Sequence, residues 1–90
     1  YMEANFNAGV YLNSKASEMR DKLADKRGNL TMAQYNSIIP MIKESCTFLE
    51  KARQIAPDRK DLWAYPLYTV YYALKNTAKT AEMEKLLKTK

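Results

Sequence analysis

The 90-residue sequence contains no histidine and one cysteine, Cys46, so an internal disulfide is excluded. Catalysis by proton transfer near neutral pH favours histidine or a carboxyl group with a shifted pKa, and structural zinc sites use cysteine and histidine. The acidic residues alternate with Lys and Arg as surface ion pairs do. We therefore expect a protein that is not an enzyme and that holds no metal and no cofactor.

Glycine and proline are also scarce, with two and three residues respectively. No glycine-rich phosphate loop is present, and no apolar run approaches the roughly 20 residues that a membrane span needs. The N-terminus lacks the basic and apolar regions of a secretory signal. The chain opens with Tyr1-Met2-Glu3, so we expect it to be a fragment of a longer protein.

The composition is 47% hydrophobic and 28% charged, which is typical of a globular domain, and the net charge is +5. A positive balance suits an acidic partner or a nucleic acid. The cations are scattered singly, however, without the dense basic stripe of a recognition helix. Nucleic-acid binding is therefore the less favoured alternative.

The first half of the chain predicts a long helical hairpin. Apolar and small residues recur every three or four positions over residues 2–27, as in an amphipathic helix that ends at Gly28. Thr31 and Gln34 have the spacing of a capping box, which predicts a second helix from about Met32 to Ala56. Pro40 interrupts that helix, so we expect a bend or a later start there. Cys46 lies at helical spacing from apolar neighbours and is expected to be a small buried residue.

A shorter hairpin is predicted for the second half. Pro57 ends the second helix, Asp58 or Asp61 is a candidate cap for the third, and Pro66 is expected to make its first turns irregular. A turn at 75–77 precedes a fourth helix over about 78–87, with Asn76 or Thr77 as its cap. Three of its residues are expected to face inward: Met83, Leu86 and Leu87. The fold class is therefore all-α, one domain over 1–90, with hairpins at about 2–56 and 59–88 stacked on each other.

Leu49, Ala52 and Pro57 have the spacing of the second helix of a tetratricopeptide repeat, and the chain resembles that family. Trp63 stands where the next repeat begins, and Gly9 resembles the small-residue step of a first helix. The first pair exceeds a standard unit of about 34 residues by roughly 24, which is about three extra turns in each helix. Elongated pairs of this kind resemble those of exported bacterial repeat proteins. The resemblance implies a periplasmic or exported location, with a cytoplasmic one left open.

What the resemblance implies about function is a scaffold that binds a protein or peptide in a concave groove lined by the first helix of each pair. Carried over position by position, the groove residues are Phe6, Val10 and Asn13 on the first helix and Tyr65, Thr69 and Tyr72 on the third. Aromatic rings there offer contact area, and amide and hydroxyl groups can form directional hydrogen bonds with a partner. A structural spacer that self-associates is the main alternative.

Five of the ten aromatic residues lie between Trp63 and Tyr72. In one interpretation Trp63 and Tyr71 belong to the core and the others cover the junction between the hairpins. In another, Tyr65 and Tyr72 contact a partner. In a third, the cluster packs against a neighbouring repeat. The sequence leaves these alternatives open.

Overall fold

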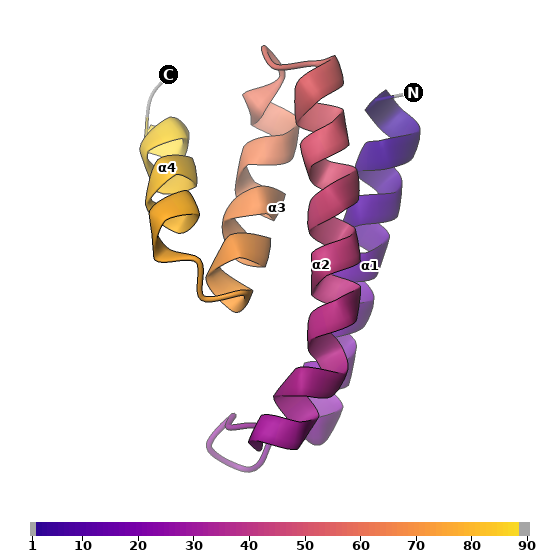
Figure 1. The fold of residues 1–90 in the computed structure, drawn as a ribbon, viewed down its shortest axis with the longest axis vertical. Coiled ribbons are helices and arrows are strands. Elements are labelled where there is room, and N and C mark those ends of the chain that lie inside the picture. The colour runs from indigo at the N-terminus through magenta and orange to yellow at the C-terminus, as the bar shows by residue number, and fades with distance from the viewer. Residues whose placement is uncertain (1, 89–90) are drawn as a thin grey trace.

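The computed structural model describes residues 2–88 and is all-helical over that range, without a β-strand. The four helices are α1 (Met2–Leu23), α2 (Met32–Ile55), α3 (Lys60–Ala73) and α4 (Thr77–Lys88). Successive helices run in opposite directions, α1 packs on α2, and α3 packs on both α2 and α4 (Figure 1). The expected all-α fold with two hairpins, the first longer than the second, is confirmed.

The loop between α1 and α2 is longer than predicted, because α1 ends at Leu23 rather than at residue 27. The side chain of Asp25 accepts hydrogen bonds from the backbone N–H groups of Arg27 (2.8 Å) and Asn29 (2.9 Å). These bonds offer the backbone an alternative to another helical turn. Gly28 has the expected positive φ of 81°, but it lies within this loop and does not cap the helix.

The start of α2 is the predicted capping box. The backbone N–H of Gln34 donates to Thr31 Oγ1 at 3.1 Å, and the N–H of Thr31 donates to Gln34 Oε1 at 2.9 Å. The helix begins before Pro40 and continues through it, with its first turns tilted from the rest (Figure 1). Pro40 and Asn36 are exposed, so water can solvate the carbonyl group that the proline leaves without a partner.

The start of α3 differs from the prediction. Neither Asp58 nor Asp61 caps it, since the N-cap position is Arg59, which makes no side-chain capping hydrogen bond. Asp61 instead pairs with Arg59, at 3.1 Å between Oδ1 and Nε. The Arg59 carbonyl accepts from the N–H groups of both Leu62 and Trp63, as is common at helix termini. The irregular first turns predicted from Pro66 are not observed, because the helix is continuous through it.

A tight turn joins α3 to α4. The N–H of Lys75 donates to the carbonyl of Tyr72, and the N–H of Asn76 donates to that of Tyr71, each at 3.0 Å. This pair of bonds is a Schellman motif, which requires a left-handed residue, and Lys75 has φ 60°. Asn76 Oδ1 then accepts from the N–H of Lys79 at 3.2 Å, so Asn76 is the N-cap of α4.

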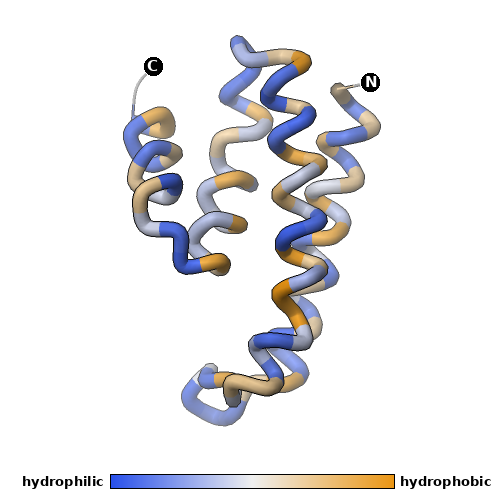
Figure 2. The backbone as a smooth tube through the Cα atoms, in the orientation of Figure 1, coloured by the Kyte–Doolittle hydropathy of each residue, from blue (hydrophilic) through white to orange (hydrophobic). Residues whose placement is uncertain are grey.

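All four helices contribute to the core, with Ala16 from α1 and Met83 from α4. Its most deeply buried large residues are Leu49, Leu67, Val70 and Met83. Trp63 and Tyr71 belong to it as well, as one interpretation of the aromatic cluster predicted. Hydrophobic positions alternate with hydrophilic ones along each helix, while the loop after α1 is mostly hydrophilic (Figure 2).

Two predictions about burial need correction. Leu87 is 44% exposed and does not face inward, whereas Met83 is buried and Leu86 partly buried. Cys46 is only half-buried, although it does pack against the core. Over residues 2–88, no helix combines the length and the apolar character that crossing a membrane requires.

Candidate binding cleft

The two hairpins differ in length, and this difference opens a cleft between them. Helices α1 and α2 have 22 and 24 residues, whereas α3 and α4 have 14 and 12. The tip of the first hairpin therefore extends beyond the turn of the second (Figure 1). The open cleft beside that turn has a volume of about 1070 Å³ and is lined by all four helices and by the loop at 28–31.

Apolar side chains from both hairpins form much of the lining. Ile38 and Ile42 of α2 are buried, at 2% and 6% exposure, and make its floor. Met32 and Tyr72 on opposite hairpins are 72% and 66% exposed. Large apolar side chains that remain this open offer contact area to a partner.

Two hydrogen bonds between helices, supported by a third within α3, hold the walls of the cleft together. Asn13 Nδ2 of α1 donates to Thr69 Oγ1 of α3 at 3.0 Å, and Thr69 Oγ1 donates to the carbonyl of Pro66 at 2.8 Å. On the other wall, the hydroxyl group of Tyr35 donates to the carbonyl of Ala73 at 2.5 Å. These bonds tie α1 and α2 to the C-terminal half of α3.

The predicted groove residues divide into two groups. Asn13, Thr69 and Tyr72 line the cleft. Phe6 and Val10 are half-buried against the core and lie outside its lining. Tyr65 is also outside it and is 62% exposed.

A row of tyrosines connects Tyr65 to the cleft. The ring centroids of Tyr65 and Tyr68 are 6.2 Å apart, and those of Tyr68 and Tyr72 are 6.3 Å apart. Tyr68 was not predicted as a site residue, although residues spaced three and four apart share a helix face. Met32 and Tyr35 reach the cleft from α2 and were not predicted either, because nothing in their local sequence indicates that position.

The charged residues of the lining are Arg20, Lys75 and Glu84. Glu84 pairs with Lys88, at 3.1 Å between Oε1 and Nζ. Lys75 Nζ lies 4.8 Å from the centroid of the Tyr35 ring, a cation–π contact.

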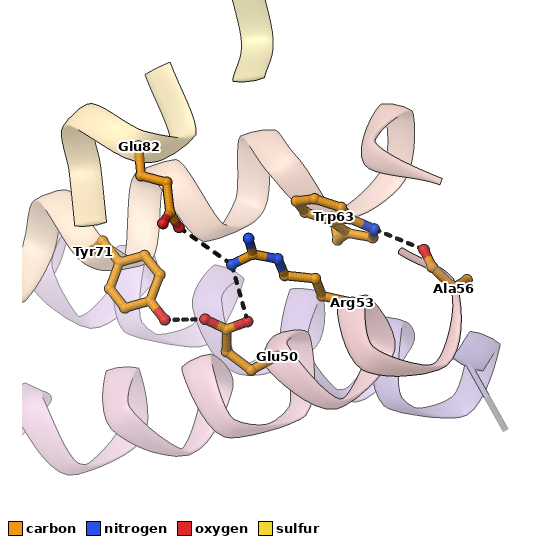
Figure 3. A network of polar contacts seen from close by, with 6 residues as sticks. All are labelled: Glu50, Arg53, Ala56, Trp63, Tyr71 and Glu82. Atoms are coloured by element: carbon orange, nitrogen blue, oxygen red, sulfur yellow. Dashed lines mark hydrogen bonds and ion pairs between the residues drawn. The ribbon is translucent and has the colours of Figure 1, made fainter. Parts of the chain in front are cut away.

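A second polar cluster, outside the cleft, joins α2, α3 and α4 (Figure 3). Arg53 pairs with Glu50 at 3.5 Å and with Glu82 at 3.4 Å, and its guanidinium carbon lies 5.0 Å from the centroid of the Trp63 ring. The Tyr71 hydroxyl donates to Glu50. Trp63 Nε1 donates to the carbonyl of Ala56 at 2.9 Å.

Burial affects two titratable side chains that lie together here, Tyr71 of the second cluster and Cys46 beside it. Burial raises the pKa of the Cys46 thiol, so the thiol is protonated at neutral pH and is a poor nucleophile. Burial, followed by contacts with Cys46 and Glu50, raises the pKa of Tyr71. In the described part of the chain, no group of three or more acidic or cysteine side chains is arranged to hold a metal ion.

Comparison of the chain with protein-family models, with curated proteins and with solved structures finds no match.

Proposed function

We propose that this protein is a binding module that holds a peptide segment of a partner protein in the cleft between its hairpins. The observation that carries the proposal is an open cleft of about 1070 Å³ with exposed Met32 and Tyr72 on its two sides. Small-molecule pockets are of roughly 300–1,000 Å³ and bury most of their ligand. An open cleft of this size suits an elongated chain segment better than an enclosed small molecule.

The chemistry of the lining also suits a peptide. Tyrosine offers a large apolar surface at a low cost in side-chain entropy, and its hydroxyl group can form hydrogen bonds with a main chain. The walls are tied by hydrogen bonds in the free protein, so less conformational entropy is lost when a partner binds.

The resemblance to tetratricopeptide repeats supports the same function. In that arrangement the first helix of each pair lines the concave surface. Here the corresponding helices are α1 and α3, and Asn13 and Thr69 join them directly. We propose that the chain is an elongated repeat unit of this kind, acts as a scaffold and performs no catalysis of its own.

A matched pair of tyrosine variants tests the proposal. Tyr72 in the cleft is 66% exposed, and Tyr11 outside it is 61% exposed. Peptides selected from a displayed library of random 12-residue sequences are expected to bind Tyr72→Ala at least about tenfold more weakly, the loss of a typical aromatic contact. Tyr11→Ala is expected to bind as the unaltered chain does. A library that yields no peptide, or peptides that ignore Tyr72→Ala, would contradict the proposal.

Self-association is the second candidate, because the exposed Met32 and Tyr72 would suit another copy of the chain equally well. Sedimentation velocity across a hundredfold range of protein concentration separates the two. Dimers that dissociate on Tyr72→Ala would favour self-association. A monomer at every concentration would leave the cleft free for a peptide.

A further inference from the structure

The cleft carries positive charge that the protein does not neutralise. Among the described residues, the one acidic side chain of the lining is Glu84, which Lys88 engages at 3.1 Å. Over residues 2–88, neither Arg20 nor Lys75 has a carboxylate partner. A binding surface with two unpaired cations favours an anionic group on what it binds.

The backbone at Lys75 distinguishes it from an ordinary surface lysine. Its φ of 60° occurs at the position of a Schellman motif where glycine is usually found, and a side chain there costs about 1 kcal/mol. Strained residues of this kind cluster at functional sites. The strained turn places a cation at the cleft, where glycine would leave none.

The contacts of Lys75 also restrict where its charge lies. Its ammonium group is over the Tyr35 ring, at 4.8 Å from the centroid, and the hydroxyl group of that ring is bound to the Ala73 carbonyl. The cation is thus held against a wall of the cleft. A cation on an aromatic face still has N–H groups available for a carboxylate.

Arg20 reaches the cleft from the first hairpin, opposite Lys75 on the second. The hydrogen bond between Asn13 and Thr69 joins α1 to α3, and both helices run in the same direction (Figure 1). Arg20 follows Asn13 by seven residues and Lys75 follows Thr69 by six. Both residues thus follow that bond in the chain direction of the two helices, Arg20 in α1 and Lys75 in the turn after α3.

Building on the proposed peptide-binding function, we infer that the bound segment is acidic, with an Asp or Glu side chain held between Arg20 and Lys75. Apolar side chains of the same segment contact Met32, Tyr68 and Tyr72. The apolar contacts supply most of the affinity, whereas the carboxylate sets the position and selects against neutral and basic sequences. The α4 N-terminus, next to Lys75, adds a partial positive charge of the same sign.

The test again uses peptides selected from the random 12-residue library. Each selected peptide is synthesised with its Asp and Glu residues intact and with Asn and Gln in their place. The protein variants are Lys75→Gly, Lys75→Arg and Arg20→Gln, with Lys43→Gln as the control. Lys43 is an exposed α2 lysine outside the cleft lining, so it reports the effect of lowering the net charge alone.

The selected peptides are expected to be enriched in Asp and Glu. An ion pair worth up to about 1 kcal/mol corresponds to a loss of roughly threefold to fivefold in affinity for Lys75→Gly and for Arg20→Gln. Lys75→Arg and Lys43→Gln are expected to stay within about twofold. The neutralised peptides are expected to bind Lys75→Gly and the unaltered chain equally, since the contact that the variant removes is already absent.

The outcomes separate this inference from the proposed function. One contrary result is a set of peptides that bind Tyr72→Ala more weakly yet lack enrichment in Asp and Glu, and another is a set that binds Lys75→Gly as tightly as the unaltered chain. Either result would contradict the inference of an acidic partner and would leave the proposed peptide-binding function intact. An equal loss with Lys43→Gln would also overturn it, because the effect would then come from net charge. Failure of all peptides to respond to Tyr72→Ala would overturn the proposed function itself.

Discussion

Gly9 of α1 lies so close to Leu49 of α2 that a Cβ atom at Gly9 would come within 2.6 Å of Leu49 Cγ and 2.8 Å of Cδ2. Ser45 spans the same crossing, with its hydroxyl group donating to the Gly9 carbonyl at 2.6 Å. Leu49 is fully buried and cannot move aside without disturbing the core. The long hairpin thus depends on the absence of a side chain at one position.

We therefore predict that Gly9→Ala destabilises the protein. In an unconstrained helix this change would stabilise by about 1 kcal/mol, but overpacking a tight core typically costs 1–3 kcal/mol. The net expectation is a loss of up to about 2 kcal/mol in the free energy of unfolding, measured by urea denaturation. Gly9→Ala combined with Leu49→Ala should cost less than the two single changes added together. A gain in stability for Gly9→Ala would show that the two helices can move apart freely.

Local features of this fold could be predicted where a side chain forms a hydrogen bond with a backbone group only a few residues away. The capping box of Thr31 and Gln34 and the cap at Asn76 were predictable, because each involves residues three positions apart. Gly9 was recognisable as a small-residue step. The end of α1 was misplaced because Asp25 bonds the loop that follows it, and no helical pattern signals that competition.

The cleft could be predicted only in part. Tyr72 and Asn13 were assigned to a groove by resemblance, and the structure places both in the lining. Met32 and Tyr35 come from α2, so their place depends on how far the first hairpin extends past the second. That relationship is set by long-range packing, including the bonds from Asn13 to Thr69 and from Tyr35 to Ala73. Periodicity within one helix contains no information about it.

The exposed tyrosines of α3 should be dispensable for folding. Tyr65 and Tyr72 are 62% and 66% exposed, so Ala at both positions is expected to cost no more than about 1 kcal/mol in unfolding free energy. Leu67, which is fully buried, provides the contrast, and Leu67→Ala is expected to cost about 2–5 kcal/mol. Thermal and urea unfolding of the two variants and of the unaltered chain measures this. A broad, non-cooperative transition for the tyrosine double variant would mean that the row of rings is structural.

The backbone conformation of Lys75 makes a separate prediction about stability. Gly and Ala at this position both remove the cation–π contact with Tyr35, so their difference isolates the effect of the positive φ. We expect Lys75→Gly to be more stable than Lys75→Ala by about 1 kcal/mol, because only glycine adopts this conformation without strain. The comparison uses the urea concentrations at the midpoints of unfolding, with equal slopes of unfolding free energy against urea for the two variants. Equal stabilities would indicate that the turn relaxes away from the left-handed conformation once the lysine is gone.

The Cys46 and Tyr71 pair predicts a loss of stability at alkaline pH. Both groups have pKa values raised above their ordinary 9.0 and 10.0, chiefly by burial. The folded protein therefore holds these two protons more tightly than the unfolded chain does. As the pH rises above about 9, the unfolded chain releases them first, and the free energy of unfolding falls. At neutral pH both groups are protonated in either state, so they cause no such slope there.

The double variant Cys46→Ala and Tyr71→Phe removes both titrations while keeping the aromatic ring in the core. It is expected to be less stable at pH 7, since the hydrogen bond from Tyr71 to Glu50 is lost, but its stability should fall less steeply between about pH 9 and 11. The rest of the sequence is identical in the two proteins, so the comparison isolates these two side chains. Urea unfolding at half-unit pH steps measures the two slopes. Parallel curves would mean that the two side chains titrate in the folded protein as they do in the unfolded chain, and that burial at this contact is incomplete in solution.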